Sequence, residues 1–245
     1  MKTLYIDCTS GVCADMLLSG FRALGAEVET GFEEEMRRLI HTVTEHCQDG
    51  HCHLHAHDHG DAHDKEHVHD HTHAHGASYA AVREVLRLAP LSENARNTAR
   101  RIYETIALAE AKVHGETLET VHFHEVGRMQ AILNVASVAV MIDMMGVDRI
   151  ICSEIHDGQG TIQCSHGIIP VPVPAVKAMM DTCSYVFKTI PIDTELVTPS
   201  GLAMLIGMGA EYGARPQGGV LAKGIGYGDR STGRSGMEIY LIEEE

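Results

Sequence analysis

Histidine dominates one internal stretch of the chain, and this stretch constrains the fold more than any other feature. Eleven of the twenty-five residues from 51 to 75 are histidine. Its only sizeable aliphatic residues are Leu54 and Val68, so it has almost nothing to bury and cannot offset the entropy of becoming ordered. The sequence therefore predicts one domain over 1–245 that is interrupted by a mobile loop at about 47–76.

The histidines of this tract indicate a metal-binding function. Most of them alternate along the chain, which places imidazoles on one side of an extended segment. Imidazole is a common ligand for nickel, zinc, copper and iron. A mobile tract with more nitrogens than one ion needs favours several exchangeable ions, which suits gathering or handing over metal. The candidate ligands are His51, His53, His55, His57, His59, His63, His67, His69, His71, His73 and His75.

Two other interpretations of the tract were weighed. One is a solvated spacer without a metal function in the cell. The other is a zinc finger built from Cys47 and Cys52 with His67 and His71. The finger is rejected because the ligand spacing does not fit and the segment lacks the apolar residues that a finger packs.

Composition excludes some classes of partner. The formal net charge is −15, so the chain has little with which to neutralise phosphates and a nucleic-acid partner is not expected. Seven cysteines form no regular framework and no signal peptide precedes Tyr5, which predicts a reduced, cytoplasmic protein. No apolar run is long enough to span a membrane, so no membrane partner is expected. Homo-oligomerisation stays open.

Hydrophobic periodicity predicts an α/β fold, with helices packed on a mixed sheet. Ser92 is the expected N-cap of a long helix that Gly115 closes. The helix over 129–145 is apolar nearly all round, so it is expected at the centre. The expected helices also include 32–45, 79–86, 175–180 and 199–212, and the expected strands are 4–8, 148–152, 184–188, 220–225 and 237–242.

Two helix starts are candidate sites for anions. The first strand leads through Ser10 and Gly11 into a helix, a geometry that exposes backbone N–H groups to an anion. Asp7 and Asp15 flank this turn and are candidate catalytic carboxylates that could hold a cation or orient water. Simple capping by Ser10 beside a surface Asp is the alternative. The segment Thr198-Pro199-Ser200 starts another helix and is a second candidate cofactor-binding position.

Two further segments carry ligand chemistry. His122 and His124 share a face if their segment is extended, and Glu125 follows directly. Two imidazoles and a carboxylate are a common set of metal ligands. The competing interpretation is a pair of buried, hydrogen-bonded histidines at a strand end. His166 precedes a rigid proline-rich segment and is a candidate catalytic or ligand group.

Taken together in order, six blocks of sequence resemble the LarC nickel-insertion family. They are Tyr5-Ile6-Asp7-Cys8 with Ser10-Gly11 and Asp15-Met16, then 109–115 with 121–127, Gly158 with Gly160, 166–175, 196–201 and 224–228. The histidine-rich loop falls where the family usually has one. The resemblance covers nearly the whole chain.

The resemblance implies an activity and its partners. Members of the family insert nickel into pyridinium-3,5-bisthiocarboxylic acid mononucleotide to make the nickel-pincer nucleotide cofactor. The resemblance also implies that CTP is consumed with Mn²⁺ or Mg²⁺. It assigns the metal site to His122, His124 and Glu125, with the histidine tract as feeder.

Three departures from the family pattern limit how much of this activity can be expected of the chain. Gln130 and Asn134 stand where the family typically has two acidic residues, and Ala14 replaces a glycine. The sequence ends at Glu245, where the family continues into a C-terminal domain linked to nucleotide binding. The expectation is therefore an N-terminal half that works with a separate C-terminal subunit. The alternatives are a non-catalytic nickel store or chaperone, and a degenerate paralogue.

Overall fold

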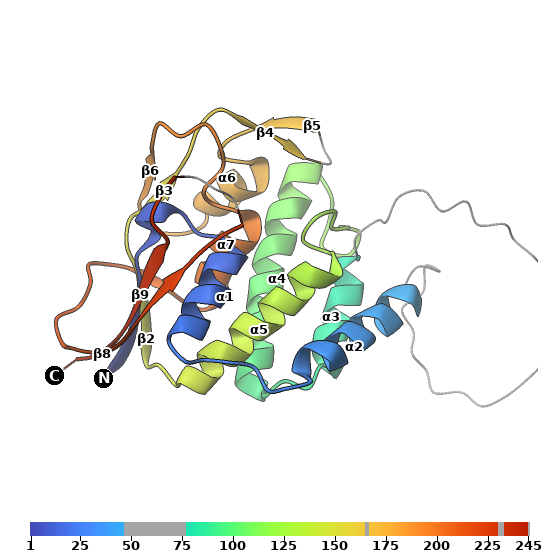
Figure 1. The fold of residues 1–245 in the computed structure, drawn as a ribbon. Coiled ribbons are helices and arrows are strands. Elements are labelled where there is room, and N and C mark those ends of the chain that lie inside the picture. Colours follow the sequence, from blue (N-terminus) through green and yellow to red (C-terminus); the bar gives the residue numbers. More distant parts are fainter. Residues whose placement is uncertain (47–76, 165–166, 230–232, 245) are drawn as a thin grey trace, which may run out of the picture.

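The computed structural model describes residues 1–46, 77–164, 167–229 and 233–244 (Figure 1). The tract His51–His75, the predicted mobile loop at 47–76 and His166 lie outside the described residues, so the predictions made for them stay predictions.

A five-stranded sheet forms one layer of the molecule. Its strand order is β7-β2-β1-β9-β8, in which β1 runs parallel to β2 and antiparallel to β9. The sheet is therefore mixed, as predicted. The strands are β1 (Lys2–Ile6), β2 (Arg149–Cys152), β7 (Glu211–Tyr212), β8 (Gly219–Gly226) and β9 (Met237–Glu243).

Two small two-stranded sheets lie outside this layer. The strands β3 (Ile155–Asp157) and β6 (Phe187–Thr189) pair in parallel. The strands β4 (Thr161–Cys164) and β5 (Gly167–Pro170) pair antiparallel, at the upper end of the helical layer in Figure 1.

The helices lie on one side of the sheet, with α1 next to it and α2 and α3 farthest away (Figure 1). Capping residues start and end α4 as predicted: the Ser92 hydroxyl accepts the N–H of Ala95, and Gly115 adopts a left-handed conformation. The helices are α1 (Ala14–Ala23), α2 (Phe32–His46), α3 (Tyr79–Leu88), α4 (Glu93–His114), α5 (Met129–Met145), α6 (Pro174–Met180) and α7 (Pro199–Gly207), with a short 3₁₀ helix η1 (Cys8–Ser10).

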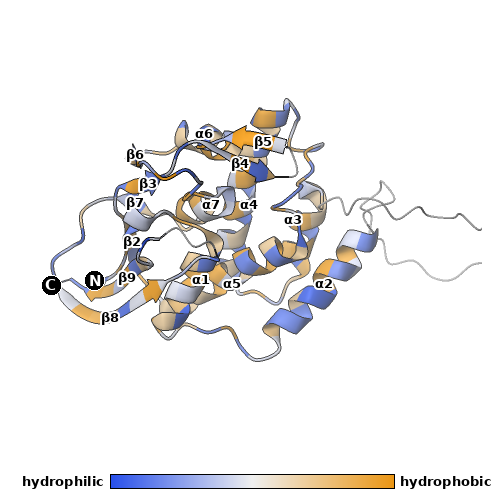
Figure 2. Cartoon of the chain, turned by 45° about the horizontal axis from the view of Figure 1, so that its top comes forward, coloured by the Kyte–Doolittle hydropathy of each residue, from blue (hydrophilic) through white to orange (hydrophobic). Residues whose placement is uncertain are grey.

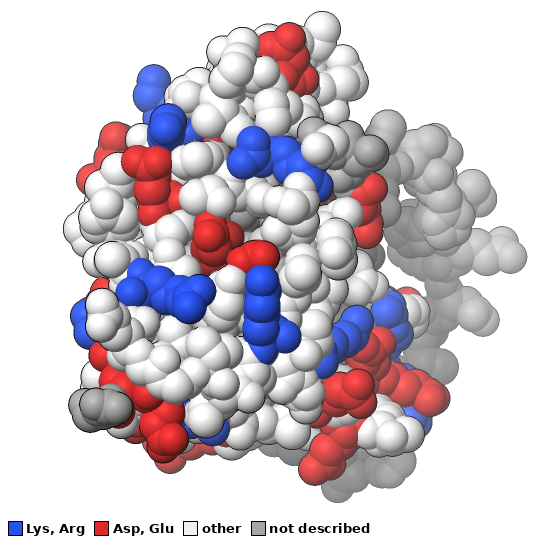
Figure 3. All heavy atoms as spheres, turned by 60° about the vertical axis from the view of Figure 1, so that its left-hand side comes forward, with Lys and Arg blue, Asp and Glu red and all other residues white. Residues whose placement is uncertain are grey.

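The core lies between the sheet and the helices. Leu4 and Ile6 of β1 face it, and the alternate residue Tyr5 packs on the other face with Tyr240. In contrast to this apolar core, the visible face of α2, the helix far from the sheet, is largely hydrophilic (Figure 2). On the sheet side, Figure 3 shows positive and negative side chains interspersed, and Lys223 pairs there with Glu238 at 2.7 Å. The α/β prediction is confirmed.

One predicted helix is too long. We expect it to reach about Tyr212, but α7 ends at Gly207. Gly209 has a φ of +77°, and the N–H of Ala210 returns to the carbonyl of Leu205, which closes the helix. The next residues instead pair with β2 as β7. Among the described helices, none combines the length and apolarity needed to cross a membrane.

Candidate functional site

Two segments far apart in the sequence meet at the start of α1 and α7. The N–H of Val12 donates to Leu196 O at 2.9 Å, and the N–H of Thr198 donates to Val12 O at 3.1 Å. Glycines permit this contact: a Cβ on Gly11 would lie 2.3 Å from Leu196 O, and one on Gly201 would lie 2.4 Å from Val12 O. The two helix N-termini are thereby brought side by side.

A cavity of about 590 Å³ opens at this junction. We call it the acidic cavity, because three carboxylates and a single basic residue, Arg234, line it among the residues that the structure describes. The side chain of Arg234 donates to Thr9 O at 2.6 Å, which ties the 233–236 segment to η1. The lining also includes Ser10, Cys13, Asp15, Glu195, Thr198, Tyr227 and Asp229.

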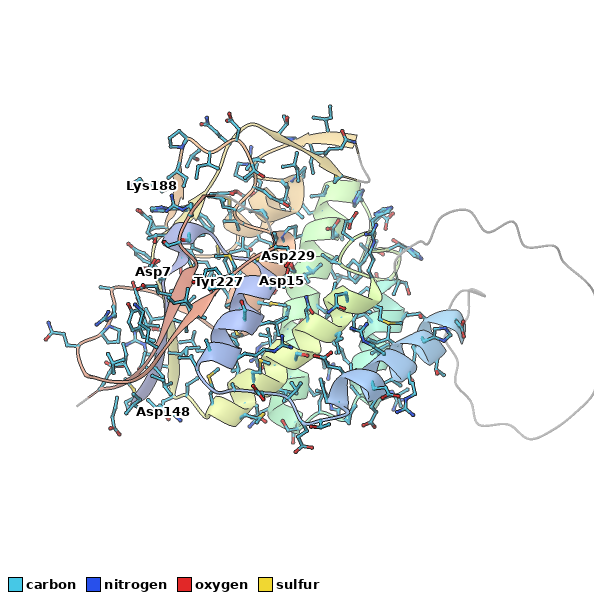
Figure 4. The ribbon with its side chains drawn as sticks, viewed as in Figure 1. Asp7, Asp15, Asp148, Lys188, Tyr227 and Asp229 are labelled. Carbon is cyan, nitrogen blue, oxygen red and sulfur yellow. The ribbon has the colours of Figure 1, made fainter. Side chains whose placement is uncertain are left out.

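Asp15 is a carboxylate of the acidic cavity whose surroundings change its pKa. Burial raises its pKa, and the nearby charge of Asp229 acts in the same direction. Figure 4 shows the two aspartates next to each other. The side-chain amide of Asn134 donates to Asp15 Oδ1 at 3.5 Å and partly opposes the shift. A carboxylate with a raised pKa is a stronger base than an ordinary aspartate.

A chain of amides continues from Asp15 to the surface of the molecule. Gln130 Nε2 donates to Asn134 Oδ1 at 2.7 Å, and Arg37 donates to Gln130 Oε1 at 3.0 Å. Gln130 and Asn134 are the two positions at which the family pattern has acidic residues. The group that contacts Asp15 is therefore the neutral amide of the buried Asn134.

Asp7 has a different role from Asp15. Its Oδ1 accepts from the N–H and the hydroxyl of Thr9, at 3.0 and 2.6 Å, so it is the N-cap of η1. It is absent from the lining of both cavities described here. The predicted pairing of Asp7 with Asp15 is therefore not formed, and capping belongs to Asp7 rather than to Ser10.

Asp157, which the sequence did not mark as a site residue, stabilises the junction of these two segments. Its Oδ1 accepts three backbone N–H groups, from Gly158, Leu196 and Val197, at 2.8 to 3.1 Å. Burial raises the pKa of Asp157, and these three donors oppose the rise. The contacts fix the segment that carries Glu195 and Thr198.

A second cavity of about 470 Å³ adjoins the first, and Glu195 and Thr198 line both. We call it the histidine cavity. It lies between the end of α4, the segment before α5, the β4–β5 pair and the start of α7. The polar residues in its lining are Glu110, His114, His124, Glu125, Gln163, Cys164, Glu195, Thr198 and Ser200.

Of the predicted group His122, His124 and Glu125, only His124 and Glu125 line this cavity. Both histidines are exposed and alternate with the buried Val121 and Phe123, as an extended segment predicts. His122, however, donates from Nδ1 to Thr120 O at 2.6 Å and is absent from the cavity lining. Glu125 lines the cavity and forms an ion pair with Arg128 at 3.1 Å.

His124 has a different imidazole neighbour from the predicted one. Its ring centre lies 5.9 Å from that of His114, in the last turn of α4. His114 Nε2 is in turn 3.3 Å from Glu110 Oε2. Within the described part of the chain, no three His, Cys, Asp or Glu side chains are already arranged to hold a metal ion.

The predicted anion-binding residues separate into two kinds. Thr198 is the N-cap of α7, accepts the N–H of Gly201 at 3.2 Å and lines both cavities, whereas Ser200 lines only the histidine cavity. Ser10 lines the acidic cavity. Gly11 packs against Leu196 instead of lining a cavity.

Several lining residues were missed by sequence reasoning, although one signal was available. Glu110 and His114 lie one helical turn apart inside the block 109–115, which contributed to the family resemblance. Asp229, Glu195 and Cys164 had no local pattern that marked them. They reach the two cavities only through contacts between distant segments.

Comparison with known proteins identifies relatives of the whole chain. A pyridinium-3,5-bisthiocarboxylic acid mononucleotide nickel insertion protein from Acetivibrio thermocellus is 34% identical, over 96% of this chain and 58% of the relative. Proteins of the same name from Clostridium kluyveri and Geobacillus kaustophilus are 34% and 31% identical, over 63% and 56% of their lengths. The chain thus spans less than two thirds of these relatives. No solved structure gives a significant match.

The family comparison covers almost the same residues as the fold. The family described as nickel insertion protein matches residues 4–241, from β1 to β9. Both cavities lie within this match. This chain belongs to the nickel insertion protein family.

Proposed function

We propose that this chain inserts nickel into pyridinium-3,5-bisthiocarboxylic acid mononucleotide. The observation that carries the proposal is the family match over residues 4–241, together with relatives named for this precursor. Two adjoining cavities, one lined by carboxylates and one by imidazoles, support it. Nickel is a substrate in this reaction.

The chemistry of the precursor requires a base. Its two thiocarboxylates flank one ring carbon, so an ion bound to both sulfurs lies against that carbon. A bond from nickel to this carbon forms as its C–H bond breaks, and the proton leaves to an acceptor. We assign the acceptor role to Asp15, because it lines the acidic cavity and its raised pKa makes it a stronger base than an ordinary aspartate.

The phosphate of the mononucleotide needs donors rather than carboxylates. The start of α7 supplies backbone N–H groups and the hydroxyls of Thr198 and Ser200, and Arg234 supplies a positive charge on the other side of the acidic cavity. Helix N-termini stabilise phosphate through their N–H groups and the helix dipole. We propose that the phosphate lies at α7 and the ring extends towards Asp15.

CTP and its divalent cation do not fit this part of the protein. Among the described residues, three carboxylates and one guanidinium line the acidic cavity, which disfavours the several negative charges of a triphosphate there. The described residues also hold no ready group of three metal ligands. We propose that CTP binds in the region that the relatives have beyond this match, supplied in the same polypeptide or a separate one.

A second candidate is a nickel-binding protein without catalysis, either a store or chaperone or a degenerate paralogue. The amide of Asn134, 3.5 Å from Asp15, favours it. The family pattern places a carboxylate there, which would raise the basicity of Asp15 further. An amide instead stabilises the ionised form of Asp15 and weakens it as a base.

Reconstitution separates the two candidates. The chain is incubated with Ni²⁺, the precursor, CTP with Mn²⁺ and the C-terminal region of the Acetivibrio thermocellus relative, and nickel-bearing nucleotide is measured by mass spectrometry. The complete relative is the positive control. Product from this chain supports insertion. Product only after Gln130→Asp with Asn134→Asp identifies a degenerate enzyme, and none from either form leaves nickel binding alone.

A further inference from the structure

We propose that His114 and His124 together form the site that receives nickel in this protein, with Glu110 as the group that orients His114. The inference rests on the proposed function for the identity of the ion. It replaces His122 by His114 as the partner of His124. The observations that carry it are the position of both rings in the histidine cavity, their separation and the contact with Glu110.

The separation of the two rings fits one shared ion. A metal about 2 Å from an imidazole nitrogen lies about 3.2 Å from the centre of that ring, so two rings on one ion have centres about 4.5–6.4 Å apart. The centres of His114 and His124 are 5.9 Å apart, with the planes inclined by 48°. Small side-chain rotations are enough to direct both rings at one point.

Glu110 completes a pattern found at metal sites. Ligand histidines usually hydrogen-bond through the second ring nitrogen to a carboxylate or carbonyl, which fixes the tautomer. Glu110 Oε2 lies 3.3 Å from His114 Nε2, one turn earlier on α4. This contact leaves Nδ1 of His114 as the nitrogen that faces an ion.

Both histidines are carried by well-anchored backbone. His114 is in the last turn of α4, which Gly115 closes. His124 follows Phe123, which is 1% exposed and packs against Tyr79 and Tyr103. The positions of the rings are therefore determined by the core, as a site of defined geometry requires.

A site with two imidazoles also suits transfer better than a complete cage. Two ligands leave open coordination positions, which the thiocarboxylate sulfurs of the precursor can occupy before the imidazoles release the ion. Soft sulfur ligands hold nickel more tightly than imidazole, so the transfer is downhill. Cys164 lines the same cavity, and we include its sulfur as a third ligand during delivery.

The position of the site relative to Asp15 supports delivery. Glu195 and Thr198 form the common wall of the two cavities. An ion held by His114 and His124 therefore lies in the cavity that adjoins the one in which we place the precursor. His122, outside the cavity, offers no such route.

The experiment measures nickel binding in the full chain after the imidazoles of residues 51–75 have been removed. All eleven histidines of 51–75 are changed to Asn, so that the tract contributes no imidazole. Ni²⁺ affinity and stoichiometry are then measured by equilibrium dialysis, with folding checked by circular dichroism. We expect one remaining ion per chain. His114→Ala and His124→Ala should each weaken it at least tenfold, and Glu110→Gln should weaken it about tenfold.

His122→Ala is the matched control, because it removes an exposed imidazole from the same segment as His124. It should leave the affinity unchanged. The proposed site would be overturned if Ni²⁺ affinity were unchanged in both His114→Ala and His124→Ala. It would also be overturned if His122→Ala lowered the affinity as much as they do. If the ion binds as expected but no nickel nucleotide forms in reconstitution, the proposed function fails and the site stands.

Discussion

The acidic cavity and the histidine cavity share a wall but are built in different ways. The first lies where two loops pack through glycines, and it brings Asp15 close to Asp229. The second lies at the end of a long helix and places two imidazoles 5.9 Å apart. A pair of crowded carboxylates suits proton transfer, and a pair of imidazoles suits a borderline metal ion. In the proposed reaction, the two cavities would thus separate proton transfer from metal binding.

The largest effect that would test this division is the loss of the proposed base. Asp15→Asn should lower formation of nickel nucleotide by about 10²- to 10⁴-fold in the reconstituted reaction, because general-base catalysis contributes that much. Nickel binding in the histidine cavity should stay the same. Asp7→Asn makes the same chemical change at a capping residue, where Asn also serves as a cap. Equal losses in the two variants would contradict the assignment.

The next effect concerns the glycine contacts that build the acidic cavity. Gly11→Ala forces a Cβ to within 2.3 Å of Leu196 O at a φ of +92°. Gly25 is the control, with a φ of +88° and no atom within 4 Å of its added Cβ. We expect Gly25→Ala to lower the free energy of unfolding by about 1 kcal/mol, and Gly11→Ala to lower it by about 1–3 kcal/mol more. Urea unfolding curves measure both free energies of unfolding. Equal losses in the two variants would mean that the segments around Gly11 and Leu196 can move apart at no additional cost, which would contradict the prediction.

The smallest effect is the dependence of stability on pH. Because the pKa of Asp15 is raised by folding, the folded state binds more protons than the unfolded state between the ordinary Asp value near 3.8 and the raised value. Stability contributed by this group is therefore lost as pH rises through that window. Asp15→Asn should be more stable than the parent above the window, by less than about 1 kcal/mol, and equal to it below. Thermal unfolding at several pH values provides the measurement, and a destabilised variant at neutral pH would contradict it.

The sequence predicts local structure well, because the signals for it are local. Ser92 and Gly115 bound α4, and continuous apolar character predicts α5. The end of α7 was wrong by several residues, because a left-handed Gly209 and pairing of β7 with β2 outweigh its helical pattern. The pattern of alternation predicts that His122 and His124 share a face, and both are exposed rather than buried, which was the competing interpretation.

The sites were harder to predict, because their residues come from distant segments. Asp15 was found from its position beside a turn, but its neighbours Asp229 and Asn134 lie 214 and 119 positions away along the chain. Asp7 looked equivalent in the sequence, and only the hydrogen bonds to Thr9 distinguish it. Nothing local in the sequence pairs His124 with His114 rather than with His122.

Asp157 links the two cavities in a way that neither reveals alone. Its single oxygen Oδ1 fixes the backbone at Leu196 and Val197, between the two residues that both cavities share. Any shift of this segment moves Glu195 and Thr198 together. The two affinities that we propose, for the ion and for the nucleotide, are therefore expected to be coupled, so a substitution in this segment should change both.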